Sequence, residues 1–247
     1  MKQRPIGVPL SRHEGRLAGQ PVLKGTPFHP TCLMFDQAHL TVLHHTTLLS
    51  AYEDEHLEHI IKRNQPKKIS TATQTNTHNR EYIGWLKDHL KNGSSDDIVT
   101  WLAQKPSPMI MRYQAYDING NTFYTKDRDQ RTTYQNSSVR IESLSAGKKP
   151  KKEVYYGTIQ EIWELDYVKI KVALFKCKWV ALSKVNVDEY GKTYLNLNNM
   201  EYHSDPFILA SQATQVSYVP DTLNENCHVV MFGKSGILGV ENVVDKK

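Results

Sequence analysis

The chain has 247 residues, 39% of them hydrophobic and 23% charged, which is typical of a globular protein and excludes wholesale disorder. It has no apolar run of about 18 residues and no apolar signal-peptide core near its start, so we expect neither a membrane span nor secretion. The formal net charge of +5 is compatible with an anionic partner but does not establish one.

The first part of the chain is predicted to be irregular and then helical. Residues 1–34 contain five prolines and four glycines without a sustained period. Over residues 35–105, apolar residues recur at helical spacing, which predicts two helices or one bent helix before residue 64. The polar, threonine-rich residues 64–79 are predicted to be a loop, and the next helix to begin at Arg80.

After residue 108 the apolar period changes to two, which predicts β-strands. Asn119-Gly120 separates two alternating segments and predicts a tight hairpin. Residues 109–235 are expected to form a β-rich domain with an exposed basic loop at 145–153, followed by a tail at 236–247. The predicted class is α+β, in which a helical segment precedes a small, barrel-like antiparallel sheet.

The sequence offers no positive sign of catalysis. The glycine-rich phosphate-binding motifs and the serine hydrolase motif are absent. Cys32, Cys177 and Cys227 form no CxxC pair, and His56 with His59 lacks the spacing of a zinc site, so surface or partly packed histidines are favoured. We expect no catalytic residue, metal, cofactor or small-molecule substrate; a cluster of carboxylates or of His and Cys side chains would revive the interpretation as an enzyme.

Residues 161–180 read EIWELDYVKIKVALFKCKWV, and the apolar positions in their second half change phase. Up to Leu174 the even positions are apolar, and from Phe175 the odd positions are. Because side chains alternate between the faces of a strand, an uncorrected slip would expose half of the apolar set. We therefore predict a β-bulge near Ala173 to Phe175, which would gather the lysines of this stretch on one face.

Lysines from this stretch and from the basic loop are the candidate nucleic-acid contacts. They are Lys169, Lys171, Lys176, Lys178, Lys148, Lys149, Lys151 and Lys152. A row of lysines can follow a phosphate backbone, with nearby tyrosine or tryptophan rings as stacking surfaces. The solvated outer face of a sheet is the more ordinary place for such lysines, where they also protect strand edges from aggregation.

Several segments resemble proteins of a known family. The most specific are the separated blocks EIWELDY, FKCKWV and DPFILASQA, which occur in the same order in the uncharacterised domain at the C-terminal end of plant CACTA (En/Spm-like) transposases. Upstream, FDQAHLTVLHHTTLLSAYEDEHLEHI, HNREYIGWLKDHL and YDINGNTFYTKDRD are similar to the segment that precedes this domain. The resemblance covers roughly residues 4–232.

The resemblance implies that this chain corresponds to the part of a transposase that follows the catalytic core. In that family the nuclease core, an RNase H-like fold with a metal-binding acidic triad, lies upstream of the segments that this chain resembles. The role of the C-terminal domain is unassigned in the family, so the resemblance transfers no functional residue.

Hypotheses of different classes follow. The first is a nuclear, non-catalytic accessory module of a DNA transposon that contacts DNA or proteins of the transposition complex. The alternative is a chromatin-reader-like barrel in which three aromatic side chains form a pocket for a peptide or a methylated lysine. A decayed fragment with no retained function is the remaining interpretation.

Overall fold

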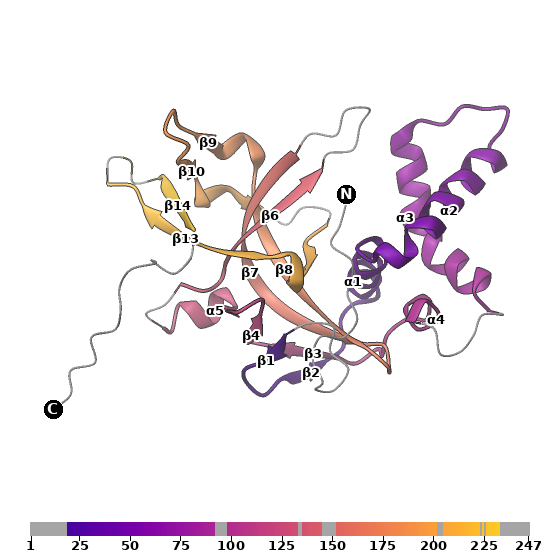
Figure 1. The fold of residues 1–247 in the computed structure, drawn as a ribbon, viewed down its shortest axis with the longest axis horizontal. Helices are drawn as coiled ribbons and strands as arrows, with labels where there is room; N and C mark the ends of the chain where they lie inside the picture. Colours follow the sequence, from indigo (N-terminus) through magenta and orange to yellow (C-terminus); the bar gives the residue numbers. More distant parts are fainter. Residues whose placement is uncertain are drawn as a thin grey trace.

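A computed structural model describes residues 19–91, 98–132, 135–144, 152–201, 205–222, 224 and 226–232. The helices of the first 103 residues gather on one side of a long, twisted sheet that contains most of the later chain (Figure 1). The order, helices and then strands, confirms the predicted α+β class. Among the helices described, none has the length and apolar character that crossing a bilayer requires.

The helical layer lies beside one end of the sheet. Its helices are α1 (Cys32–His44), α2 (Ser50–Arg63), α3 (Thr71–His89) and α4 (Ile98–Ala103), with a 3-10 turn at Thr47–Leu49. The Thr31 hydroxyl caps α1 by accepting a hydrogen bond from the N–H of Met34 at 3.4 Å, which satisfies one of the unpaired donors at the helix start. α2 and α3 pack against each other as a helical hairpin.

α3 begins at Thr71, and not at Arg80 as predicted. Its first turns use threonines and asparagines from the stretch that was expected to be a loop. The Ser70 hydroxyl caps the helix by accepting a hydrogen bond from the N–H of Thr73 at 3.1 Å, and His78 is buried against α2. The cap and this packing outweigh the weak helix propensity of the intervening residues.

The segment predicted to be irregular contains short strands in its described part. β1 (Gln20–Pro21) pairs with β4 (Ala115–Ile118), and β2 (Thr26–Phe28) pairs with β3 (Ile110–Tyr113). Strands of two or three residues are too short to show the alternation of apolar and polar residues that predicts a strand. Their partner strands also lie far along the chain.

β4 and β5 (Asn121–Tyr124) form the hairpin predicted at Asn119-Gly120. Asn119 has a φ of 52° and Gly120 a φ of 74°, the successive positive values of a type I′ turn. β1, β4 and β5 make a three-stranded sheet, after which the short helix α5 (Lys126–Asp129) follows.

The second sheet has 11 strands and is built on a long hairpin of β7 (Lys152–Asp166) and β8 (Lys171–Val180). Its main order is β11-β8-β7-β6-β13-β14-β10-β9; β12 also pairs with β8, and β3 joins β2 to β7. The other strands are β6 (Ser138–Leu144), β9 (Val185–Val187), β10 (Thr193–Leu195), β11 (Met200–Glu201), β12 (Phe207–Leu209), β13 (Thr214–Pro220) and β14 (His228–Phe232).

The described strands do not close into the small barrel that was expected. β7 pairs with β6 along its first part and with β3 near its end, whereas β8 pairs with β11 and β12 on its other edge. The path from β11 to β9 remains open. Alternating apolar residues predict antiparallel strands, but they do not determine whether the first and last strands meet.

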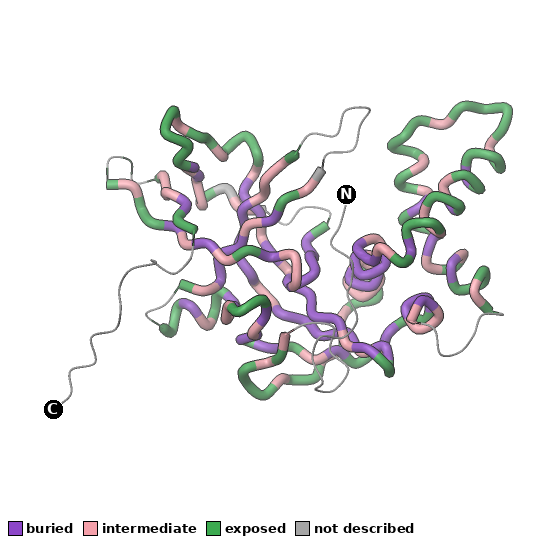
Figure 2. The backbone as a smooth tube through the Cα atoms, viewed as in Figure 1, coloured by how far each residue is buried: buried purple, intermediate pink, exposed green. Residues whose placement is uncertain are grey.

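Most residues of the long hairpin near its turn are buried (Figure 2), and their side chains belong to two different cores. The helix-side core lies beneath α1, α3 and α4 and includes Trp163, Val172 and Leu174. The opposite core, which we call the strand-side core, includes Ile162 and Phe175 and is covered by β3, β4, β5 and β6. A smaller cluster joins the far end of β8 to β13 and β14.

Candidate nucleic-acid interface

The β-bulge of the long hairpin lies in β7, at Gln160, and not near residues 173–175 of β8 as predicted. The register shifts between Ile159 and Glu161, whereas β8 continues without interruption. Because of the extra residue, Ile159 and Ile162 both lie in the strand-side core although they are three positions apart. The bulge therefore keeps the apolar side chains on both sides of Gln160 directed into the same core.

The change of phase within β8 has a different cause, because both faces of this strand are buried near the turn. Residues 172–175 contribute alternately to the helix-side core and the strand-side core. Farther along, Cys177 and Trp179 continue the strand-side core only. A strand that passes from two-sided to one-sided burial produces the same sequence pattern as a slip of register.

The lysines of this stretch consequently do not share one face, and that prediction was wrong. Lys176 and Lys178 lie on the same face of β8 as Val172, whereas Lys171 lies on the opposite face. Lys169 precedes the strand, in the turn of the hairpin. Successive residues of an uninterrupted strand point to opposite faces, so no single basic row forms.

Lys176 belongs to an internal ion pair. Its Nζ lies 2.7 Å from Oε1 of Glu161 and 5.8 Å from the centre of the Trp163 ring. Burial would raise the pKa of Glu161, but hydrogen bonds from Lys176 and Trp163 and the charges of Lys176 and Arg112 outweigh it, so the pKa lies below its ordinary value. This lysine holds the two strands together at the bulge.

The other candidate lysines are dispersed. Lys169 and Lys171 lie at the turn of the long hairpin, where Nζ of Lys169 is 6.0 Å from the centre of the Trp101 ring. Lys152 lies at the opposite end of β7, with its Nζ 2.6 Å from a carboxylate oxygen of Glu142. The remaining loop lysines lie outside the described residues: Lys148, Lys149 and Lys151.

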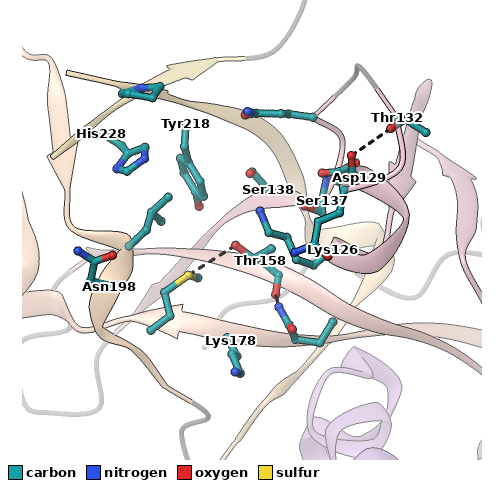
Figure 3. Close-up of a pocket in the computed structure, with 16 residues that line it drawn as sticks. Lys126, Asp129, Thr132, Ser137, Ser138, Thr158, Lys178, Asn198, Tyr218 and His228 are labelled. Carbon is teal, nitrogen blue, oxygen red and sulfur yellow. Dashed lines mark hydrogen bonds between the residues drawn. The ribbon is translucent and has the colours of Figure 1, made fainter. Parts of the chain in front are cut away.

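Lys178 lines a cavity of about 650 Å³ beside β7 and β8 (Figure 3). The lining also comes from α5, the start of β6, and the strands β13 and β14. Amide and hydroxyl side chains are frequent in it, among them Gln135, Ser138, Thr158 and Asn198. The cavity is therefore able to make hydrogen bonds to a ligand.

The described lining is cationic as well as polar. Lys126 on α5 contributes a second ammonium group. Asp129 is the acidic residue among the described lining residues, and its two carboxylate oxygens accept hydrogen bonds from the N–H groups of Asn136 at 3.0 Å and Ser137 at 2.8 Å. The carboxylate is thus used to fix the segment after α5, and the lining retains an excess of positive charge.

The same cavity does not resemble an aromatic cage. Of the tyrosine, tryptophan and phenylalanine side chains described, Tyr218 is the one that lines it, and its hydroxyl donates a hydrogen bond to the carbonyl oxygen of Gly157 at 2.9 Å. The ring of His228 lies nearby. A chromatin-reader pocket needs about three converging aromatic rings, so this cavity gives that alternative no support.

The histidine pair singled out in the sequence is divided between the interior and the surface. His56 is buried in the α2–α3 hairpin, with its Nδ1 atom 2.9 Å from Nδ1 of His78, whereas His59 is exposed. Within the described ranges, no group of three His, Cys, Asp or Glu side chains is arranged to hold a metal ion. The absence of enzymatic activity stays a prediction.

Sequence reasoning identified Lys178 but missed its neighbours in the cavity. Lys126 and His228 belong to α5 and β14, short elements that lie far from β8 in the chain. Neither residue stands in a motif of known function, and only the pairing of the strands brings them to one cavity.

The fold and the cavity define an α+β protein with a polar, cationic site beside an open antiparallel sheet. Residues 163–230 match a family described as "Domain of unknown function (DUF4216)", a domain found in transposase-like proteins. No curated protein and no solved structure matches the chain significantly.

Proposed function

We propose that this chain is a non-catalytic accessory module of a transposase-like protein of the plant CACTA (En/Spm-like) type, and that it contacts DNA in the nucleus. The family match of residues 163–230 supports the link to transposase-like proteins. The single observation that carries the DNA contact is the cavity in which Lys126 and Lys178 occur together while the carboxylate of Asp129 is occupied by backbone donors.

The chemistry of this cavity suits a phosphodiester. Ammonium groups attract phosphate as point charges, and amide and hydroxyl side chains donate hydrogen bonds to phosphate and sugar oxygens. Its volume of about 650 Å³ is in the range of small-ligand sites and can receive a nucleotide of a bound strand. Contacts of this kind position a protein on DNA without reading the sequence.

Binding of the full chain to labelled single- and double-stranded oligonucleotides tests the proposal. We expect affinity to be measurable at about 50 mM salt and to fall steeply by about 200 mM, because released counterions drive phosphate contacts. The double variant Lys126→Ala/Lys178→Ala should bind roughly tenfold more weakly. Its matched control, Lys184→Ala/Lys192→Ala, removes the same charge from exposed positions outside the cavity lining. Undetectable binding of the unchanged chain at about 50 mM salt would refute the proposal.

A further inference from the structure

The tip of the α2–α3 hairpin forms a surface that the cavity does not include. We define the hairpin tip as residues 59–80, which comprise the end of α2, the connecting loop and the first turns of α3. It stands away from the sheet in Figure 1, and most of it is exposed in Figure 2. A projecting element of this kind can approach a large partner without obstruction from the other described residues.

The hairpin tip is strongly basic. It contains five basic and no acidic residues: Lys62, Arg63, Lys67, Lys68 and Arg80. The formal net charge of the whole chain is also +5, so the charges outside the tip sum to zero. A concentration of one sign on a projecting surface attracts an oppositely charged partner.

Two acidic residues that flank the tip pair with three of its five basic residues and leave it positive. Nζ of Lys62 lies 3.0 Å from a carboxylate oxygen of Glu58. Arg63 and Arg80 both bind Glu81, each with a nitrogen 2.9 Å from a carboxylate oxygen, so one carboxylate serves two guanidinium groups. Lys67 and Lys68 are exposed in the connecting loop and form no ion pair with any described residue. These two ammonium groups are therefore available to an anion.

Apart from Arg80, the exposed face of α3 at the tip includes uncharged hydrogen-bonding groups. Thr73, Asn76 and Asn79 are exposed, and the two asparagine amides make no hydrogen bond to another described residue. Exposed helix faces are more often stabilised by charged pairs and by residues of higher helix propensity. Since buried His78 and Tyr82 anchor this helix, the outer amides are not needed for its formation.

We propose that the hairpin tip binds double-stranded DNA, with the first turns of α3 in the major groove and Lys67 and Lys68 on the flanking phosphates. This inference rests on the proposed function and names the surface that holds the duplex. The major groove, about 12 Å wide, admits one α-helix, and asparagine amides pair with the N6 and N7 edge of adenine. An anionic lipid surface would favour apolar side chains beside the lysines, whereas the face of Asn76 and Asn79 is polar.

The loop lysines provide the first test. Lys67→Ala/Lys68→Ala should weaken duplex binding by the full chain about tenfold and reduce the slope of log affinity against log salt by about 2, the loss expected for two phosphate contacts. Lys87→Ala/Lys91→Ala is the matched control, because it removes the same charge near the other end of α3. The control should bind a random-sequence duplex as the unchanged chain does.

The asparagines provide the second test. Asn76→Ala/Asn79→Ala should leave affinity for a random-sequence duplex nearly unchanged but abolish the base preference found by selection from a random duplex library. Alanine has the higher helix propensity, so α3 is expected to persist, which circular dichroism verifies. A library selection that returns the same preference with and without these amides would contradict the groove assignment.

The outcomes separate this inference from the proposed function. If the unchanged chain binds no DNA at about 50 mM salt, the proposed function fails, and the duplex assignment fails with it. If the unchanged chain binds a duplex, the cavity variant binds weakly and Lys67→Ala/Lys68→Ala binds normally, only the assignment to the hairpin tip fails. Binding to phosphatidylserine vesicles that requires Lys67 and Lys68, without duplex binding, would assign the tip to membranes instead.

Discussion

His56 on α2 and His78 on α3 face each other across the helical hairpin, with their Nδ1 atoms 2.9 Å apart. At this distance one nitrogen must donate its hydrogen and the other must accept it, so the two rings cannot both be protonated without repulsion. His44 stacks on the ring of His78 with 5.4 Å between centroids, and Tyr82 does so with 4.5 Å. Uncharged rings thus hold α1, α2 and α3 together.

Acid is expected to destabilise this helical layer. Burial, followed by the charges of His44 and His56, lowers the pKa of His78 to about 3, and burial lowers the pKa of His44 to about 4. Histidines of the unfolded chain titrate near pH 6.5, so the unfolded state binds more protons below that value. The free energy of unfolding should therefore fall as the pH decreases from about 6.5 towards about 3 to 4.

Glu53 acts in the opposite direction, because burial and then the charge of Asp54 raise its pKa to about 7. Its stabilising contribution is full below about pH 4.5 and disappears as the pH rises through about 7. Urea unfolding at about pH 7 and about pH 5 separates the two effects. We expect His78→Gln to weaken the acid-induced loss of stability and Glu53→Gln to enlarge it; identical pH dependence in all three proteins would contradict this assignment.

Replacement by alanine should change the free energy of unfolding in opposite directions at two glycines. A Cβ atom at Gly157 would lie 2.5 Å from Cε3 of Trp179 and 2.7 Å from the carbonyl oxygen of Lys178. Gly157→Ala should lower the free energy of unfolding by about 1–3 kcal/mol. At Gly84 in α3 no described neighbour lies within 4 Å of such a Cβ, so Gly84→Ala should raise it by about 0.5–1 kcal/mol. Denaturant unfolding of both variants checks the signs.

The buried carboxyl group of Glu164 accepts hydrogen bonds from the hydroxyls of Tyr113 at 3.3 Å and Tyr116 at 3.2 Å. Replacing either tyrosine by phenylalanine removes one donor from a site that water does not reach. We expect each variant to lose about 1–3 kcal/mol of unfolding free energy. Tyr190→Phe is the control, because Tyr190 is 80% exposed and its change should stay within about 0.5 kcal/mol. Equal midpoints for all the variants would count against this network.

Lys176 and Lys171 both belong to β8, but we expect them to contribute differently to the stability of the fold. Lys176→Ala removes the partner of partly buried Glu161 and should destabilise the fold by about 1 kcal/mol, a value reduced by the remaining exposure of the pair. Lys171→Ala should change the stability by no more than about 0.5 kcal/mol. Denaturant midpoints for the two variants provide the comparison, and a larger loss for Lys171→Ala would reverse our assignment of roles.

Local signals in the sequence were sufficient for the features that depend on adjacent residues. Asn119-Gly120 predicted its hairpin because positive φ angles are an intrinsic preference of this dipeptide. The start of α3 was missed because threonine and asparagine favour caps and loops, and the contact of His78 with α2 is not visible in the local pattern. The bulge was assigned to the wrong strand because two-sided burial of residues 172–175 imitates a slip.

The candidate sites depended still more on distant contacts. Sequence reasoning grouped lysines by their proximity in the chain, but the continuous pairing of β8 separates Lys171 from Lys176 and Lys178 by face. The cavity around Lys178 depends on α5 and β14, whose positions follow from strand pairing over long distances. The basic residues of the hairpin tip were visible in the sequence, but their importance depends on α3 beginning at Thr71.

β7 pairs with β6 along its first part and with β3 near its end, and this division determines which fragments of the chain can fold. The segment that matches a family, residues 163–230, begins inside this strand. A fragment cut at Trp163 would lose the half of β7 that pairs with β6, and the helices that cover Leu174 on the neighbouring strand. The matched segment is therefore smaller than the unit that folds, and a fragment of residues 163–230 alone should expose apolar surface and unpaired strand edges and should aggregate.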